Sequence, residues 1–290
     1  MKYGIYYAYW AKKWGVDYVP FVERIANCGF DCMEISCAGV KDMPEDEIKR
    51  LKDAADAAGL FMTGGYGPKA SESLASADPA IVENGVAFWR DTFKVLEKLG
   101  ITSVGGGLYG YWPADFSKPF DKRADLDRSV VNMRRVADMA ADHGITVLGM
   151  EVLNRHEGYM INTAKECVAY CEAVGKPNVM VHLDTYHMLL EEDSFTEAIH
   201  TAGKRLGHVH VGENNRRLPG QGCIINWEEI GKALKDIGYD GNIVTEPFVM
   251  DGGQVGQDVR VWRPLLDDTS DERLDRDAAE SVKFMHKIFD

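Results

Sequence analysis

The features that would place this 290-residue chain in a membrane or an export route are missing from its sequence. No window approaches the ~18–20 consecutive apolar residues that a membrane span needs. The first ten residues, MKYGIYYAYW, lack a cationic run followed by an apolar stretch, so we expect no signal peptide there. These absences predict a soluble, cytoplasmic protein that does not bind membranes.

Positive charge is also in short supply. The chain has 33 basic residues against 46 acidic ones, and its net charge is −13. Binding of a phosphate backbone needs clustered Lys and Arg. The only basic pair of note is Arg216–Arg217, so nucleic acid is a poor candidate for a partner.

Cysteine is scarce, and none of the six residues forms a C-x-x-C pair. Cys167 and Cys171 stand four apart in a helical pattern, which is compatible with a metal pair, although reduced core residues are the simpler interpretation. Low-complexity segments and Pro/Ser-rich linkers are absent. With 45% hydrophobic residues there is ample material for a large core. We therefore expect a single domain over residues 1–290.

What the sequence does contain is a regular alternation of strand-like and helix-like segments. Apolar runs predict eight strands, at residues 3–9, 32–36, 60–66, 102–109, 146–152, 179–184, 206–211 and 242–248. Amphipathic patterns between them predict helices at 17–28, 44–58, 79–99, 123–143, 163–174, 194–202, 227–237 and 271–288. Four of these helices end at a glycine that can adopt the left-handed cap conformation: Gly29, Gly59, Gly100 and Gly144.

Eight strands alternating with eight helices predict an α/β protein with a (β/α)8 barrel. A doubly wound open sheet is the alternative, but it usually carries a Gly-rich phosphate turn after an early strand, and none is present. Two long segments, 109–122 and 212–226, follow strands and would lie at the catalytic end of a barrel.

Four of the predicted strands end in or near a side chain that can bind a metal. These residues are Glu151, Asp184, His210 and Glu246, spaced 33, 26 and 36 residues apart, about one strand-plus-helix unit each. A parallel barrel brings such strand ends together at one mouth. The sequence therefore predicts a divalent-metal site with carboxylates available for proton transfer.

The position of these side chains strengthens that interpretation. Asp184 follows the apolar run VMVHL, where an unpaired carboxylate would cost several kcal/mol or become neutral. His208 and His210 alternate on one strand and must share a face, so one can ligate while the other supports a neighbour. His187, three residues past Asp184, can reach a substrate oxygen. The remaining histidines considered, His143, His182 and His200, fit structural roles better.

Several other residues fit a substrate pocket at the same mouth. Arg216 or Arg217 can steady negative charge on a substrate oxygen. Trp14, Trp112 and Phe248 stand just past strand ends and suit the walls of a small pocket. A metal there can chelate two adjacent substrate oxygens, and two carboxylates flanking one carbon suit epimerisation.

Long motifs show which family the chain resembles. They are MKYGIYYAYW, GGGLYGYWPADFSKPFDK, EVLNRHE, LDTYHMLLEEDSF, AIHTAG, GHVHVGENNRRLPGQG, EPFV and VGQDVRVWR. Together they run nearly from end to end and resemble the ketose 3-epimerases, which interconvert D-fructose with D-psicose (D-allulose) and D-tagatose with D-sorbose.

The resemblance implies a xylose-isomerase-like TIM barrel that binds a divalent cation, Mn²⁺ or Co²⁺ ahead of Mg²⁺, and assembles into homo-oligomers, either dimers or tetramers. It implies that the four strand-end residues ligate the metal, and that Glu151 and Glu246 also act as the acid–base pair at C3, through a cis-enediolate. The residues implied to bind the O1–O3 end of a ketose are Glu157, His187 and Arg216. Those implied to enclose the rest are Tyr6, Trp14, Trp112 and Phe248, with Tyr66 and Gly107, which depart from the common family residues, near the far end.

The residues of the sequence, taken without the resemblance, leave other functions to be considered. Another sugar isomerase of this type would need a second cation site, for which no second carboxylate cluster is seen. A barrel endonuclease would need a basic face. A carbon–carbon lyase acting on 3-keto C-glycosides would use the same enolate chemistry and is the alternative enzyme. A sugar-binding protein without turnover would be expected to have lost Glu151 or Glu246, and both are present.

Overall fold

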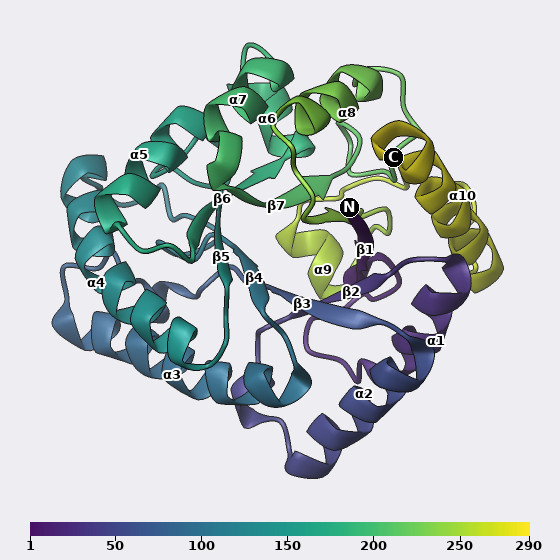
Figure 1. The fold of residues 1–290 in the computed structure, drawn as a ribbon. Coiled ribbons are helices and arrows are strands. Elements are labelled where there is room, and N and C mark those ends of the chain that lie inside the picture. Colours follow the sequence, from purple (N-terminus) through teal and green to yellow (C-terminus); the bar gives the residue numbers. More distant parts are fainter.

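The computed structural model describes residues 1–290 as a closed barrel of eight parallel strands in sequential order, with β8 pairing back onto β1. Helices surround the strands on the outside (Figure 1). The strands are Lys2–Tyr6 (β1), Cys32–Ser36 (β2), Phe61–Gly65 (β3), Ser103–Gly106 (β4), Val147–Glu151 (β5), Val179–Asp184 (β6), Leu206–Val211 (β7) and Asn242–Thr245 (β8). The predicted (β/α)8 barrel is confirmed.

The helices that cover the barrel follow the sequence patterns closely. They are Val19–Cys28 (α1), Glu45–Ala58 (α2), Pro79–Leu99 (α3), Lys122–Asp142 (α4), Ala164–Val174 (α5), Phe195–Ala202 (α7), Trp227–Asp236 (α8) and Asp271–Phe289 (α10). Two short helices were not predicted, Thr185–Glu191 (α6) and Gly253–Asp258 (α9). Four 3₁₀ turns complete the list, at Tyr7–Tyr9, Val40–Asp42, Ala70–Glu72 and Gly203–Arg205.

Glycines end helices as the sequence predicts. Gly29, Gly59, Gly100 and Gly144 all have φ between +71° and +98°, the left-handed region that glycine enters without a steric penalty. Gly106, the last residue of β4, has φ +131°, and a Cβ there would lie 2.0 Å from the Tyr66 backbone oxygen. This glycine ends β4 three residues before the predicted limit and opens the turn beside the barrel mouth.

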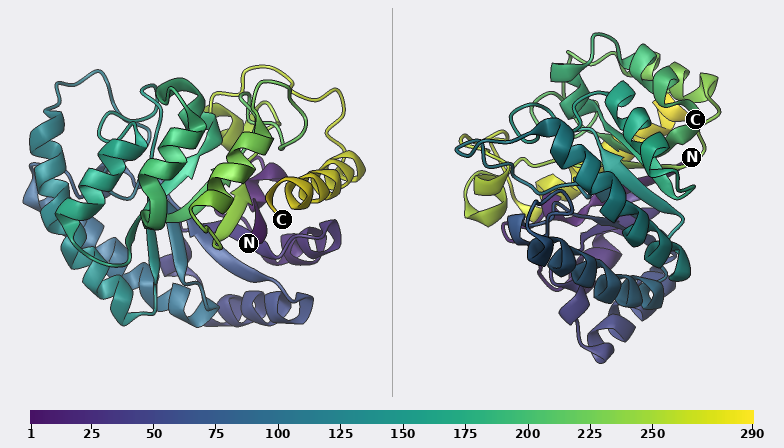
Figure 2. Two further views of the ribbon diagram at one scale, coloured as in Figure 1. Left: turned by 45° about the horizontal axis from the view of Figure 1, so that its top comes forward. Right: turned by 90° about the vertical axis from the view of Figure 1, so that its left-hand side faces the viewer.

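The strands form the centre of the molecule. Every residue of β2 is buried, and most residues of the other strands are buried as well. Figure 2 shows the helices wrapped around the strands in two further views, with the two termini near each other. None of the helices is both long and apolar enough to span a membrane.

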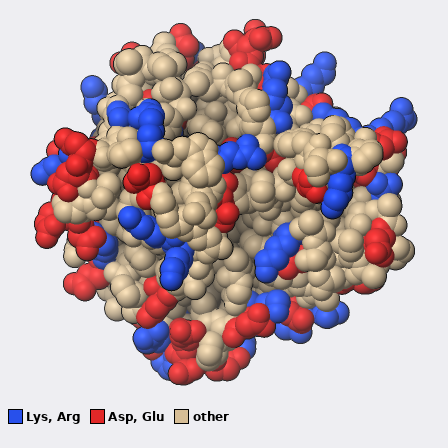
Figure 3. All heavy atoms as spheres, turned by 180° about the vertical axis from the view of Figure 1, so that it is seen from behind, with Lys and Arg blue, Asp and Glu red and all other residues tan.

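The face opposite to that of Figure 1 carries both signs of charge. Figure 3 shows its Lys and Arg side chains scattered among Asp and Glu, with no large patch of one sign. This face therefore has no concentrated group of Lys and Arg of the kind that binds a phosphate backbone.

Candidate active site

The four predicted metal ligands lie at the same end of the barrel. Glu151 ends β5, Asp184 ends β6, His210 is the penultimate residue of β7, and Glu246 directly follows β8. Asp184 and His210 are partners in the register between β6 and β7, which places their side chains at one level. One ligand atom from each of the four residues lies within 4.8 Å of the others. The carboxyl ends of the strands therefore gather these side chains as the spacing predicted.

The donor set fits a divalent cation. Asp184 and His210 are almost fully buried, and Glu151 is 8% exposed. His210 Nδ1 has no hydrogen-bond partner, and it lies 3.9 Å from Glu151 Oε1 and 3.8 Å from Glu246 Oε2. A buried nitrogen without a partner among three carboxylates is suited to a metal bond. Oxygen-rich sites with one imidazole suit Mn²⁺, Co²⁺ or Mg²⁺.

Arg216 is the cation that the chain itself supplies to this cluster. Its Nη1 lies 2.9 Å from Asp184 Oδ2 and 2.7 Å from Glu246 Oε2. The guanidinium also stacks on the Tyr186 ring, with its Cζ 3.7 Å from the ring centroid. Its φ is +64°, a conformation that bulky side chains rarely adopt. Arg217, by contrast, donates to the Leu265 backbone oxygen at 2.6 Å and takes no part in the cluster.

The crowded carboxylates change the acidity of the ligands. Burial raises the pKa of Glu246 to about 7, and the carboxylates of Glu151 and Asp184 add to the effect against Arg216 and His210. Burial alone would lower the pKa of His210, but the surrounding carboxylates, first Glu34 and then Glu246, raise it to about 10. Both groups therefore hold protons near neutral pH when no cation shares the site.

These protons predict how metal affinity depends on pH. A metal binds the unprotonated ligands, so the protons on Glu246 and His210 compete with it, and affinity must rise with pH. We expect a rise of roughly tenfold per pH unit from pH 7.5 to 9, where only His210 loses a proton, and a steeper rise below pH 6.5, where both do. Calorimetric titration of Mn²⁺ at several pH values measures this. An affinity that stays flat from pH 6 to 9 would contradict it.

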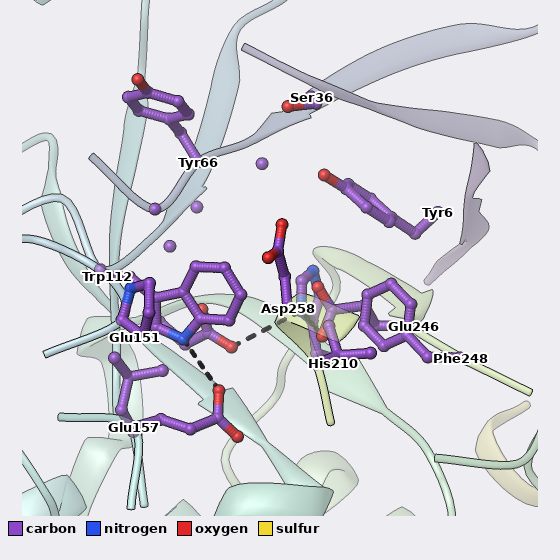
Figure 4. Close-up of a pocket in the computed structure, with 18 of the residues that line it drawn as sticks. Tyr6, Ser36, Tyr66, Trp112, Glu151, Glu157, His210, Glu246, Phe248 and Asp258 are labelled. Atoms are coloured by element: carbon purple, nitrogen blue, oxygen red, sulfur yellow. Dashed lines mark hydrogen bonds and ion pairs between the residues drawn. The ribbon is translucent and has the colours of Figure 1, made fainter. Parts of the chain in front are cut away.

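A cavity of about 270 Å³ opens above the four ligands. All of the site residues predicted from the sequence line it except Asp184, which lies beneath Arg216. They are Tyr6, Trp14, Tyr66, Gly107, Trp112, Glu151, Glu157, His187, His210, Arg216, Glu246 and Phe248. Figure 4 shows Trp112 and Glu157 on one side of the cavity and Tyr6 and Phe248 on the other. The wall is thus aromatic, with charged groups gathered at the base.

Glu157 is held in place from two sides. Its Oε2 accepts a hydrogen bond from Trp112 Nε1 at 2.9 Å (Figure 4), and its Oε1 accepts one from Asn154 Nδ2 at 3.1 Å. Burial alone would raise the pKa of Glu157, but His187 and Arg216 lower it below its usual value. The carboxylate is therefore a charged acceptor at the edge of the cavity.

His187 presents a defined tautomer to the site. Asn154 approaches its Nδ1 with the backbone nitrogen at 3.2 Å and with Nδ2 at 2.8 Å. Because both approaching groups are donors, Nδ1 is the acceptor and the proton of the neutral ring is on Nε2. That nitrogen lies 3.5 Å from Glu151 Oε1, so the ring offers a donor beside the carboxylates.

The two histidines of β7 both face the barrel interior, but only His210 belongs to the group of four ligands. His208 lies one step deeper, with Nε2 3.1 Å from Glu34 Oε2. His182 is also buried in the interior and lies outside the cavity lining. His143 pairs with Glu97, and His200 lies 3.7 Å from Asp236.

This arrangement predicts unequal effects for the two β7 histidines. His210→Ala removes a ligand, whereas His208→Ala leaves all four in place, so we expect a much larger loss of Mn²⁺ affinity and turnover for His210→Ala. Titration of Mn²⁺ followed by electron paramagnetic resonance measures the affinity of both variants. Equal losses would mean that the ligand is misassigned.

The sequence interpretation missed several residues near the site, among them Glu34, Asn154 and Asp258. Glu34, on β2, contacts His210, and its signal is a lone carboxylate inside the buried run CMEIS. Asn154 orients His187 and Glu157, and Asp258, on α9, lines the cavity and accepts from Trp14 Nε1 at 2.7 Å. Asn154 stands in the motif EVLNRHE and Asp258 in the motif VGQDVRVWR, but neither motif by itself indicates a role for that residue.

The barrel fold and the group of four candidate ligands at the carboxyl ends of its strands indicate the class of enzyme to which the chain belongs. Residues 22–282 match the family described as xylose isomerase-like TIM barrel, which covers most of the chain. The protein belongs to this family of barrels with their site at the carboxyl ends of the strands. Within it, the chain belongs to the ketose 3-epimerases, and it is an isomerase of the epimerase type.

That narrower assignment depends on full-length relatives. The chain is 45% identical to the D-psicose 3-epimerase of Enterocloster bolteae, covering all of this chain and 96% of the relative. It is 46% identical to the D-psicose 3-epimerase of Ruminiclostridium cellulolyticum, and the match covers 100% of this chain and 98% of the relative. The crystal structure of D-psicose 3-epimerase with D-tagatose from Clostridium cellulolyticum H10 superposes with a TM-score of 0.98 at 46% identity, with each chain fully covered.

Proposed function

We propose that this protein epimerises free ketohexoses at C3, interconverting D-fructose with D-psicose and D-tagatose with D-sorbose. The observation that carries the proposal is the pair of carboxylates, Glu151 and Glu246, that face one aromatic-walled cavity from different strands. Relatives named D-psicose 3-epimerase at 45–46% identity over the whole chain support the choice of substrate class.

The residues at the base of the cavity suit the O1–O3 end of a ketose. Glu157 offers an ionised acceptor to a hydroxyl, while His187 Nε2–H and the Arg216 guanidinium offer donors to oxygens that gain negative charge. The aromatic side chains opposite exclude water and contact the apolar faces of the sugar. The remaining carbons would lie toward Tyr66 and Gly107.

Proton transfer is assigned to the two glutamates. One removes the C3 proton from one face of the sugar, which leaves a cis-enediolate across C2 and C3, and the other returns a proton to the opposite face. Glu151, Asp184, His210 and Glu246 would hold a divalent cation, Mn²⁺ or Co²⁺ ahead of Mg²⁺. When bound, that cation polarises the C2 carbonyl and offsets the enediolate charge, a contribution of several kcal/mol.

Exchange of carbon-bound protons of the sugar with solvent deuterium shows at which carbon the enzyme removes a proton. In D₂O with Mn²⁺, we expect each of the four ketoses to gain deuterium at C3 as its C3 epimer appears. Loss of the C3 proton signal in ¹H NMR measures this exchange, because the protons on the different carbons have separate signals. Deuterium at C1 would indicate aldose–ketose isomerisation instead. No exchange in any ketose, despite stoichiometric metal binding, would move the assignment to another enzyme of this barrel, such as a lyase that acts on 3-keto C-glycosides.

We also propose that the protein works as a homo-oligomer in the cytoplasm. All six cysteines are unpaired, which suits a reducing compartment. Large apolar side chains such as Trp262 and Phe120 are more than half exposed, as expected of surfaces that meet another subunit. Light scattering against the chain mass of 32.3 kDa separates a monomer from a dimer or tetramer.

A further inference from the structure

A charged side chain lies beneath the four ligands and is not part of the proposed mechanism. Glu34 is in the middle of β2, its side chain is 0% exposed, and it does not line the cavity. Burying a carboxylate in this way is expensive unless donors surround it. The groups that contact the Glu34 carboxylate therefore indicate its role.

Two hydrogen-bond partners and a second histidine converge on this carboxylate. Glu34 Oε1 lies 2.7 Å from His210 Nε2, while Oε2 accepts from Thr63 Oγ1 at 2.8 Å and lies 3.1 Å from His208 Nε2. Gly65, on β3, pairs in register with Ser36, and a Cβ at Gly65 would approach Glu34 Oε1 to 3.2 Å and the Tyr6 ring to 3.0 Å. The absence of a side chain at Gly65 leaves room for Glu34 to reach His210.

The contact with His210 determines which ring nitrogen holds the proton. An ionised carboxylate only accepts hydrogen bonds, so Nε2 carries a hydrogen, and in the neutral ring that binds a metal the lone pair is on Nδ1. Nδ1 has no other partner and lies between Glu151 and Glu246, at 3.9 and 3.8 Å from their oxygens. The lone pair is thus presented to the place where the ligands converge.

Packing completes the orientation of the ring. His182 meets the His210 ring edge to face, with 4.1 Å between centroids and an interplanar angle of 86°. Neither nitrogen of His182 has a hydrogen-bond partner, so its contribution is steric. The His210 ring is held in one plane by His182 and in one tautomer by Glu34.

We propose that Glu34 is a positioning residue, which holds His210 as the Nε2–H tautomer and thereby directs Nδ1 to the metal. The inference rests on the proposed function, because it requires a cation at the four ligands. A carboxylate hydrogen-bonded to the far nitrogen of a histidine ligand also makes the ligand nitrogen more basic, and loss of such a partner typically costs 10–100-fold in metal affinity. Glu34 touches neither substrate nor metal.

A purely structural role for Glu34 makes a different prediction. If Glu34 only satisfied buried donors, replacing it would lower stability but leave the metal affinity of the folded protein unchanged. Thr63→Val is the matched control, because it removes a second donor to Glu34, keeps the volume nearly constant and leaves the Glu34–His210 contact in place. We expect this control to bind Mn²⁺ within about threefold of wild type, since the lost hydrogen bond is remote from the ligands.

The test measures metal binding rather than turnover. Titration of Mn²⁺ by electron paramagnetic resonance is expected to show one site in wild type and a dissociation constant raised about 10–100-fold in Glu34→Gln. Long-range ¹H–¹⁵N NMR of the protein loaded with Zn²⁺, a diamagnetic probe, is expected to show His210 protonated at Nε2. Because this NMR measurement uses the wild-type protein, it tests the tautomer of His210 even if the Glu34→Gln variant fails to fold.

Each result separates this inference from the proposed function. Unchanged Mn²⁺ affinity in Glu34→Gln, or a His210 ring protonated at Nδ1 in the loaded wild type, overturns the role of Glu34 while the four ligands stand. A wild type that binds no Mn²⁺ at these ligands overturns the metal-dependent function itself, and the inference with it.

Discussion

Glu151→Gln and Glu246→Gln are each expected to lose at least about 100-fold in turnover of D-fructose while keeping the fold. General acid–base catalysis by a positioned side chain contributes typically 10²–10⁴-fold, and an amide can neither take the C3 proton nor return it. Both side chains are replaced by groups of the same size in a site that already contains donors, so the barrel is expected to remain intact. Turnover at saturating Mn²⁺, measured by chromatography of D-psicose, gives the effect.

The matched control for this pair is Glu97→Gln on α3. Glu97 is exposed, pairs with His143 and does not line the cavity, so we expect wild-type turnover. If either active-site variant retained more than about 10% of the wild-type rate, the change in barrier would be below roughly 1.4 kcal/mol. Such a small change would exclude that glutamate as the acid or base.

Asp184→Asn is expected to abolish stoichiometric Mn²⁺ binding, with a loss of affinity well beyond 100-fold. Asp184 is 1% exposed, and burial alone would raise its pKa, but Arg216, His187 and His210 lower the pKa of the carboxyl below its usual value. The residue is therefore a charged carboxylate that is available to a cation at neutral pH. Removal of a supporting partner already costs 10–100-fold, so removal of the ligand charge itself costs more.

The measurement for this variant is Mn²⁺ stoichiometry after dialysis, followed by turnover. Asp236→Asn provides the control, because Asp236 ends α8 and pairs with Lys232 outside the site. One bound Mn²⁺ per chain in the dialysed Asp184→Asn protein would show that the ion is held elsewhere.

The alternation of strands and helices could be predicted from the sequence because it depends on the local periodicity of apolar residues. Runs such as VMVHLD and LGHVHV predicted β6 and β7 to the residue, and Gly100 and Gly144 marked the ends of helices by a conformation that only glycine adopts easily. The ends of other strands were harder to predict. The aromatic run after Tyr6 continues the apolar pattern, but the chain turns there into a 3₁₀ segment with the aromatic side chains still buried.

The group of four candidate ligands could be predicted because each of them stands at or near the end of a buried strand, where an unpaired charge is costly. Glu34 escaped notice for the opposite reason, since it lies in the middle of β2 and its partners come from strands far away in sequence. Asn154 and Asp258 act through contacts that only the closed barrel creates. Helix α9 was missed because GGQVGQD has the glycine content of a loop.

We propose that this ketose 3-epimerase requires a divalent cation at Glu151, Asp184, His210 and Glu246 for turnover. It is tested most directly by incubating EDTA-stripped protein with D-fructose, with and without added Mn²⁺, and following D-psicose by chromatography. We expect no D-psicose without metal, and formation of D-psicose at the full rate after Mn²⁺ is restored. Equal D-psicose formation in both samples would contradict the role of the metal, and none in either would contradict the epimerase activity on free ketohexoses.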